Sequence, residues 1–220
     1  DPTNDVCGFD AARKLAILSS IGFRANVTFD DVLVEGIEKI DKSDIQYAKD
    51  MGYTIKLLTV ALRQENGIAL NVYPAFLPDN HPLSSVKGAY NAIYVTGNIV
   101  DDIMFYGRGA GALPTASAVM GDVISTAQHI LNGSTGTGMI MTDTKRIPFY
   151  SSLKLQNSYY FRLDVDDVTG VLSQIAAAFA ENDISICEVV QKRKTKGLAE
   201  LVLITELASR ESILQVEKGL

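Results

Sequence analysis

Residues 1–14 read DPTNDVCGFDAARK, an acidic loop with one proline and one glycine that runs directly into a helical pattern. At about 100° per residue, the helix predicted over 9–23 places Asp10 and Lys14 inside an arc of mostly large apolar side chains. Burying a charge costs several kcal/mol unless the charge is paired or used, so the pattern predicts a buried acid and base and a candidate site. The arc consists of Ala11, Leu15, Ile17, Leu18 and Ile21, and the other face of Ala12, Arg13, Ala16, Ser19 and Ser20.

The spacing of Asp10 and Lys14 also has a simpler interpretation. Residues four apart on a helix surface commonly form a salt bridge, which contributes roughly 0.3–0.5 kcal/mol. Spacing alone leaves both interpretations open, and the position of the pair on the apolar arc is what favours a site.

Composition limits the classes of function. A chain of 220 residues that is 47% hydrophobic can bury a substantial core in one or two domains. A formal charge of −6 and a pI near 4.9 argue against nucleic-acid or anionic-membrane partners, which need a basic face, and favour small molecules. Cys7 and Cys187, like His81 and His129, have no disulfide-framework or metal spacing, so we expect no metal and reduced thiols in the cytoplasm.

No apolar run approaches the ~20 residues that a membrane span requires, and no signal peptide precedes the first motif. The chain begins with Asp1 inside a loop, and residues 212–220 read as a helix with nothing after it. We therefore expect the natural protein to continue beyond both ends.

The first 132 residues predict a domain of strands and helices. A second helix is expected over 43–51 and a long amphipathic helix over 114–131, which a proline opens and Asn132-Gly133 closes. Four strand-like runs lie between them, and their short connections favour antiparallel pairing in one sheet. These runs are Tyr53–Arg63, Gly67–Leu77, Ala89–Gly97 and Asp101–Tyr106. The exposed face of that sheet is expected to form a homodimer or a higher homo-oligomer.

The run Gly-Ser-Thr-Gly-Thr-Gly over 133–138 has no side chain that could anchor a core, so we expect a linker over 133–150. Residues 151–220 then predict the order βαββα, which one further strand would complete as a ferredoxin-like unit. The missing strand leaves a sheet edge that is expected to pair with another chain. The predicted class is α+β throughout.

Residues 107–112, Gly-Arg-Gly-Ala-Gly-Ala, match the Gly-x-Gly-x-x-Gly/Ala pattern between a strand and a helix. A dinucleotide-binding unit needs a second parallel strand after that helix, and the linker follows instead. The glycines could serve only a tight turn, but we favour close approach of this backbone to a cofactor that is held mainly elsewhere.

Three segments occur in order within residues 1–131: residues 1–18, which contain Gly8-Phe9-Asp10-Ala11-Ala12-Arg13-Lys14; residues 53–92, which contain Tyr53-Thr54-Ile55-Lys56-Leu57-Leu58, Pro82-Leu83, Val86, Gly88 and Asn91-Ala92; and Gly107-Arg108-Gly109-Ala110-Gly111 with Pro114-Thr115-Ala116-Ser117-Ala118-Val119. In this order and spacing they resemble the homoserine dehydrogenase family. Residues 159–220 resemble an ACT domain, a regulatory module that binds small molecules, through Asp167-Val168-Thr169-Gly170-Val171-Leu172 and Ile184-Ser185-Ile186.

The resemblance implies an enzyme that interconverts aspartate semialdehyde and homoserine with NADP or NAD, in threonine, methionine and isoleucine biosynthesis. Lys14 matches the family's catalytic lysine, which exchanges a proton with the substrate oxygen. Asp10 and Asp5 match the substrate-binding part of the site, and Gly109 and Gly111 the loop near the nicotinamide nucleotide. In the ACT-like part, the loop with Asp167 and Gly170 would bind an amino-acid effector.

Two departures from the family pattern matter. The family's substrate-contacting Glu falls two residues before Asp1 and the nucleotide-binding domain is absent, so this chain alone is expected to be inactive. Thr169 replaces the usual proline before Gly170, which loosens the effector loop. The alternative function is a non-catalytic regulatory module that binds an amino acid.

Overall fold

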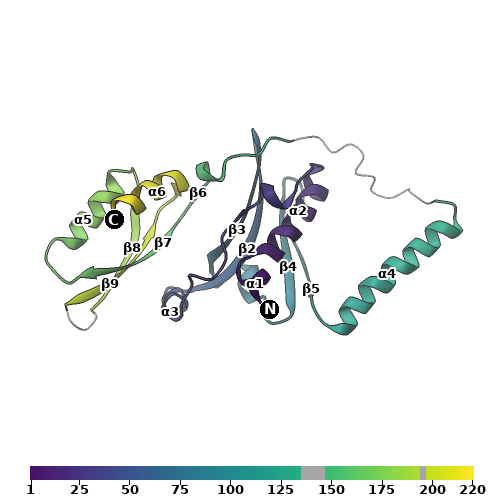
Figure 1. Cartoon of the computed structure of the whole chain (residues 1–220), viewed down its shortest axis with the longest axis horizontal. Coiled ribbons are helices and arrows are strands. Elements are labelled where there is room, and N and C mark those ends of the chain that lie inside the picture. The colour runs from purple at the N-terminus through teal and green to yellow at the C-terminus, as the bar shows by residue number, and fades with distance from the viewer. Residues whose placement is uncertain (135–146, 194–196) are drawn as a thin grey trace. The chain divides into compact units, whose positions relative to one another are not determined.

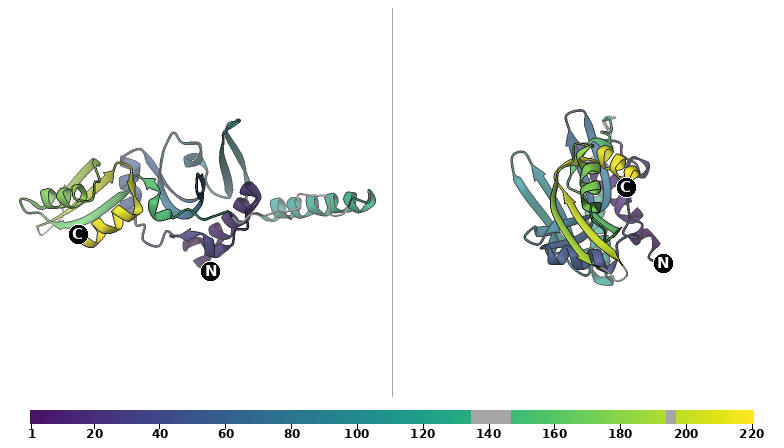
Figure 2. Two further views of the ribbon diagram at one scale, coloured as in Figure 1. Left: turned by 90° about the horizontal axis from the view of Figure 1, so that it is seen from above. Right: turned by 90° about the vertical axis from the view of Figure 1, so that its left-hand side faces the viewer.

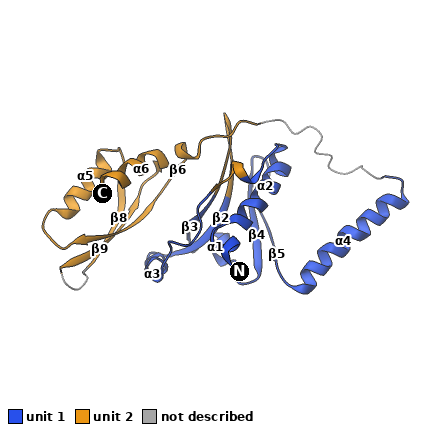
Figure 3. Cartoon of the chain, in the orientation of Figure 1, with its two compact units in different colours: residues 1–29, 34–59, 72–146 blue, residues 30–33, 60–71, 147–220 orange. Residues whose placement is uncertain are grey.

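The structure is a computed structural model that describes residues 1–134, 147–193 and 197–220 (Figure 1). The chain divides into two compact units (Figure 3), of which the first comprises residues 1–29, 34–59 and 72–146 and the second residues 30–33, 60–71 and 147–220. Most of the glycine-rich linker expected from Gly133 lies outside the described residues. The boundaries 1–132, 133–150 and 151–220 therefore stay a prediction.

Residues 1–134 form two separate sheets and four helices. Their elements are α1 (Thr3–Val6), α2 (Phe9–Phe23), β1 (Leu33–Val34), α3 (Lys42–Asp50), β2 (Tyr53–Gln64), β3 (Gly67–Pro78), β4 (Tyr90–Gly97), β5 (Asp101–Arg108) and α4 (Ala112–Leu131). One sheet has the order β1-β3-β2, and β4 and β5 form an antiparallel hairpin of their own. The expectation of one sheet over residues 53–106 was wrong. Strand β3 ends at Pro78 and the connection after it carries Pro82, and neither proline has an N–H group to donate to a strand ladder.

Helix α2 packs mostly through small side chains. Ala12, Leu15, Ala16 and Ser19 are buried, whereas the larger Ile17 is 62% exposed. The helix begins at Gly8, which has a φ of +79° and whose missing Cβ would lie 3.1 and 3.2 Å from side-chain atoms of Val72 and Val34. The backbone conformation therefore favours glycine there, and a Cβ atom would in addition press on both valines.

Helix α3 begins with a capping box. The Asp41 carboxylate accepts hydrogen bonds from the backbone N–H groups of Ser43 and Asp44, at 2.7 and 3.1 Å, and the Asp44 carboxylate accepts one from Asp41 N–H at 2.9 Å. These contacts satisfy backbone donors that no helical partner reaches. The helix therefore starts one residue earlier than the predicted 43–51.

The hairpin of β4 and β5 has an exposed apolar face. Its register pairs Ile93 with Phe105 and Val95 with Ile103, so these four side chains lie on one face. They are 41, 61, 43 and 38% exposed in the same order. Exposed apolar patches of this kind commonly mark an interaction surface.

We predict that this face joins two copies of the protein. Light scattering at micromolar concentration should report a dimer or larger oligomer for the wild type, and Phe105→Glu should shift the mass toward the monomer because it buries an unpaired charge. Ile99→Glu, in the turn of the same hairpin where Ile99 is 87% exposed, should leave the mass unchanged. A wild-type monomer would contradict this prediction.

The opposite face of the hairpin carries a hydrogen-bonded carboxylate. Tyr94 and Thr96 donate hydrogen bonds to Asp102, the latter at 2.7 Å, and these bonds hold the pKa of Asp102 below its ordinary value. The same carboxylate raises the pKa of the Tyr94 hydroxyl. The His81 ring, 5.2 Å from the Tyr94 ring between centroids, adds a weaker favourable charge interaction with Asp102.

A depressed carboxyl pKa makes stability depend on pH in one direction. The contribution of Asp102 is present above its unfolded pKa of about 3.9 and is lost as pH falls through its lower folded pKa. Asp102→Asn should therefore lower the denaturation midpoint at pH 6, and the gap to wild type should shrink toward pH 3. Asp101→Asn, a neighbouring residue in a left-handed backbone conformation that suits Asn, is the control and should show no gap at either pH. A gap independent of pH would contradict the assignment.

Helix α4 runs as a single uninterrupted helix (Figures 1 and 2), and none of its residues is buried. It begins two residues before the predicted Pro114, with Gly111 at its N-cap and no side chain that caps its first N–H groups. Among the described residues, no helix is long and apolar enough to cross a membrane.

The C-terminal part folds as the predicted βαββα unit. Its elements are β7 (Tyr160–Asp166), α5 (Val171–Ala180), β8 (Ile186–Arg193), β9 (Leu198–Thr205) and α6 (Arg210–Gly219). Both neighbours of the central strand β9 are antiparallel to it, in the order β7-β9-β8. Two further strands, β6 (Gln156–Asn157) and β10 (Ala208–Ser209), form a short antiparallel pair that the sequence had not predicted. The α+β class is confirmed.

The core of this unit lies between the sheet and helices α5 and α6. Phe179 is fully buried, and its ring meets that of Phe161 edge to face with centroids 5.2 Å apart. The rest of the buried cluster consists of Ile175, Ile184, Leu201, Leu203, Ala208, Ile213 and Val216. The edges of the sheet are β7 and β8, so the pairing of such an edge with another chain stays a prediction.

Candidate functional site

Asp10 and Lys14 form an ion pair on the first turns of α2. The Lys14 Nζ atom lies 2.6 Å from Asp10 Oδ2, and the two side chains are 60% and 44% exposed in that order. The expectation of a buried acid and base was wrong. Small residues pack α2 onto its core, which turns the arc of Asp10, Lys14, Ile17 and Ile21 outward.

This exposed arc combines one ion pair with large apolar side chains. Ile17, Leu18 and Ile21 are 62, 40 and 43% exposed, although an isolated helix surface would normally carry polar residues at such positions. An exposed ion pair contributes little to stability. The arrangement instead leaves an ammonium group, which can donate a proton, beside a carboxylate that can accept hydrogen bonds.

The other predicted substrate-binding residue, Asp5, lies in the segment before α2. Asp5 lies exposed in the short helix α1, and its carbonyl oxygen accepts a hydrogen bond from Gly8 N–H at 3.2 Å. In the same loop the Cys7 thiol donates a hydrogen bond to the Glu38 carboxylate, which raises the pKa of Cys7 and lowers that of Glu38. A raised thiol pKa disfavours the thiolate, so Cys7 is poorly suited to act as a nucleophile.

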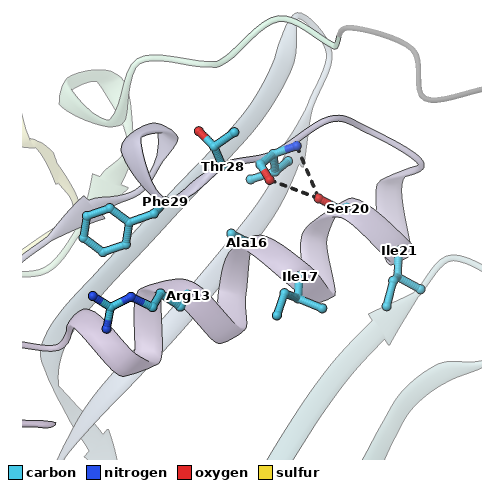
Figure 4. A pocket seen from close by; sticks show the side chains of 8 residues that line it. Arg13, Ala16, Ile17, Ser20, Ile21, Thr28 and Phe29 are labelled. Carbon is cyan, nitrogen blue, oxygen red and sulfur yellow. Dashed lines mark hydrogen bonds between the residues drawn. The ribbon is translucent and has the colours of Figure 1, made fainter. Parts of the chain in front are cut away.

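A cavity of about 610 Å³ lies along α2 beside residues 27–29 (Figure 4). The Arg13 guanidinium lies over the Phe29 ring, 5.5 Å from its centroid. The Ser20 hydroxyl accepts a hydrogen bond from Val27 N–H at 3.2 Å and donates one to its carbonyl oxygen at 3.3 Å. None of the predicted site residues lines this cavity.

The glycine-rich loop continues the β4–β5 hairpin and leads into α4. The Gly109 N–H group donates a hydrogen bond to the Ala89 carbonyl oxygen at 2.9 Å, which extends the ladder beyond the last strand residue. Gly111 has a φ of +123°, a conformation that favours glycine, and α4 begins with the next residue. Bare backbone followed by the uncapped N-terminus of a 20-residue helix suits an anionic nucleotide, because the helix dipole favours negative charge there.

One face of this loop is held by stacked side chains. The Arg108 guanidinium lies 5.2 Å from the centroid of the Tyr90 ring, and Tyr90 stacks parallel to Tyr106 at 4.9 Å. In the sequence, Arg108 stands within the glycine-rich run of residues 107–112. The structure places it on an aromatic ring, a contact that its separation of 18 residues from Tyr90 did not reveal.

The predicted effector residues lie in the loop between β7 and α5. Asp167 N–H donates a hydrogen bond to the Gly197 carbonyl oxygen at 2.8 Å, and Gly170, with a φ of +97°, is the N-cap residue of α5. The loop therefore enters the helix through a left-handed glycine.

The structure brings only some of the predicted residues into contact. Among the described residues, Asp10 and Lys14 are joined by an ion pair, but no hydrogen bond or ion pair links them to Gly109 or Gly111. The effector loop belongs to the second compact unit. In the described part of the chain, no group of three His, Cys, Asp or Glu side chains is arranged to hold a metal ion.

Comparison with protein families gives two matches. The family model for homoserine dehydrogenase matches residues 1–124, and the model for the ACT domain matches residues 159–218. Curated relatives named homoserine dehydrogenase include one from Bacillus subtilis, 39% identical over all of this chain and 51% of the relative. Another, from Corynebacterium glutamicum, is 40% identical over 94% of this chain and 47% of the relative.

Solved structures agree with these matches. A homoserine dehydrogenase from Thiobacillus denitrificans superimposes with a TM-score of 0.89 at 34% identity, over 98% of this chain and 50% of that chain. One from S. aureus, solved at pH 6.5, has a TM-score of 0.68 at 30% identity, over 97% and 51%. The chain thus spans about half the length of the relatives it matches.

Proposed function

The chain belongs to the homoserine dehydrogenase family, and on that premise we propose that it supplies the substrate-binding and proton-transfer part of an oxidoreductase that interconverts aspartate semialdehyde and homoserine. The observation that carries the proposal is the Asp10–Lys14 pair, 2.6 Å apart on the exposed arc of α2. Because the chain spans about half of its relatives, we propose that it does not turn over substrate by itself.

Lys14 supplies the proton in this proposal. When the aldehyde is reduced, negative charge develops on its oxygen, and an ammonium group within hydrogen-bond reach stabilises that charge and donates the proton. In the reverse direction the neutral amine of Lys14 accepts the proton of the homoserine hydroxyl. Asp10 holds the Lys14 ammonium by the ion pair and offers a second carboxylate oxygen to a cationic group of the substrate.

The glycine-rich loop fits a nicotinamide nucleotide, NADP or NAD, which would supply or accept the hydride. Gly109 and Gly111 present backbone without side chains, and the first N–H groups of α4 have no side-chain cap. We propose that these two glycines contact the cofactor and that Asp5 contacts the substrate from α1.

The C-terminal unit supports a regulatory role. The family model for the ACT domain matches residues 159–218. We propose that Asp167 and Gly170 contribute to an amino-acid effector site there. Feedback by threonine, methionine or isoleucine would suit an enzyme early in their biosynthesis. We propose that the protein acts as a homo-oligomer in the cytoplasm; Cys7 and Cys187 are both free, as is usual in that compartment.

The proposed activity is tested with the complete natural protein that carries this chain. Aspartate semialdehyde should cause oxidation of NADPH or NADH, and homoserine should drive the reverse reaction. A folded preparation that binds an amino acid but oxidises neither nucleotide would reject the enzyme and leave the non-catalytic regulatory module as the function.

A further inference from the structure

The end of the β4–β5 hairpin next to the glycine-rich loop has one face almost without side chains. Asn91 on β4 lies opposite Gly107 on β5, and the Gly109–Ala89 hydrogen bond carries the ladder two residues further. Because side chains alternate along a strand, Arg108 lies on the other face, over Tyr90. At this end the face carries the backbone of two glycines, the small Ala89 and one polar side chain, Asn91, and it continues along the hairpin into the apolar pair Ile93 and Phe105.

The Asn91 carboxamide packs directly against Gly109. A Cβ atom on Gly109 would lie 1.9 Å from Asn91 Nδ2 and 2.5 Å from its Cγ. The φ of Gly109 is not in the left-handed region, so the need for glycine here comes from the position of this amide and not from the backbone conformation. A Cβ on Gly107 would meet nothing within 4 Å, which leaves open space on the same face.

The amide of Asn91 is available to a ligand. In the described part of the chain it forms no hydrogen bond, and it offers two N–H donors and one carbonyl acceptor. A planar ligand that carries its own carboxamide could lie on the bare glycine backbone and exchange both kinds of hydrogen bond with Asn91. The nicotinamide ring has this shape and this group.

We propose that Asn91 is a further cofactor-binding residue, whose carboxamide hydrogen-bonds the nicotinamide end of the nucleotide at the Gly107–Gly109 backbone. The inference rests on the proposed function and adds a side-chain contact to a loop that otherwise offers only backbone. The Arg108–Tyr90–Tyr106 stack lies on the opposite face, so it leaves the glycine face open to the ligand.

The test measures the dissociation constant of NADPH or NADH for the complete natural protein, by equilibrium titration without the second substrate. Asn91→Ala should raise that constant about 5–10-fold, as expected for the loss of one or two neutral hydrogen bonds. Turnover at saturating nucleotide should change much less. Asn91→Asp, which keeps the size but removes both donors, should weaken binding at least as much.

The Gly109→Ala variant is a second, independent test, because its new methyl group must displace the Asn91 amide. It should weaken nucleotide binding about as much as Asn91→Ala does, and the double variant should be no weaker than either single one. Asn98→Ala makes the same chemical change in the turn at the far end of the hairpin and should leave the dissociation constant unchanged.

Wild-type nucleotide affinity in both Asn91→Ala and Asn91→Asp would overturn the inference and leave the proposed function intact. Fully additive effects of Asn91→Ala and Gly109→Ala would also overturn it, since they would show two unrelated causes. Failure of the proposed function looks different, because the wild-type protein would then neither bind the nucleotide nor turn over substrate. The denaturation midpoint of each variant reports whether it is folded.

Discussion

Replacing Lys14 by Met in the complete natural protein is expected to lower turnover by about 10²–10⁴-fold, the usual range for loss of a general acid or base. Methionine keeps most of the length of the side chain but has no proton to donate. The dissociation constant of the nucleotide should stay nearly constant, because its proposed contacts lie on another element.

Because the Asp10–Lys14 ion pair is exposed, a purely structural role of Lys14 predicts a different result from a catalytic role. Lys14 is 60% exposed and Asp10 44%, so an ion pair with only a structural role would contribute a few tenths of a kcal/mol, and its loss would barely move the denaturation midpoint. Lys42→Met, at the exposed start of α3, is the matched control and should keep normal turnover. A Lys14→Met variant with near-normal turnover would contradict the catalytic assignment.

The second large effect concerns the core of the ACT domain. Phe179→Ala is expected to reduce the free energy of unfolding of this domain by about 3–5 kcal/mol, because the ring is fully buried and the space it leaves cannot be refilled. The loss includes its edge-to-face contact with Phe161.

Chemical denaturation followed by circular dichroism measures this loss. Leu172→Ala on the same helix α5 is the control, since Leu172 is 43% exposed and its truncation should cost much less. A Phe179→Ala midpoint equal to that of the control would show that the domain does not depend on the predicted core.

The elements were predictable where one periodicity dominates. The bounds of α2 agree with the predicted 9–23, and β2 and β3 each end one residue beyond prediction, because β-branched and apolar runs bounded by glycine and proline specify strands locally. The βαββα order of the ACT domain followed from the same signals. The pair β6–β10 was missed because two-residue strands leave no periodic pattern.

The face of α2 was assigned wrongly for a physical reason. Of the predicted inward arc only Leu15 is buried, whereas Ala12, Ala16 and Ser19 of the other face bring the helix backbone close to its core and Ile17 and Ile21 face outward. A sequence records side-chain size, but which face packs closely depends on a partner surface elsewhere in the chain. The spacing in the sequence therefore revealed the Asp10–Lys14 pair, but the sequence did not reveal that the pair lies on an exposed face.

The position of Asn91 beside the glycine-rich loop was likewise not predictable from the sequence alone. The glycines of residues 107–112 predicted close approach of the backbone to a cofactor, but the strand residue opposite Gly107 is 16 residues upstream of it. Only the register of β4 against β5 places the amide on Gly109.

Chemical rescue tests the role of Lys14 most directly. Lys14→Ala in the complete natural protein should lose turnover, and small primary amines added to the assay should restore part of it, with a rate that follows the pKa of the amine, because a soluble ammonium replaces the missing proton donor. The exposed position of Lys14 leaves room for such an amine. Turnover that the substitution leaves unchanged, or that is lost and that no amine raises, would contradict the assignment of proton transfer to Lys14.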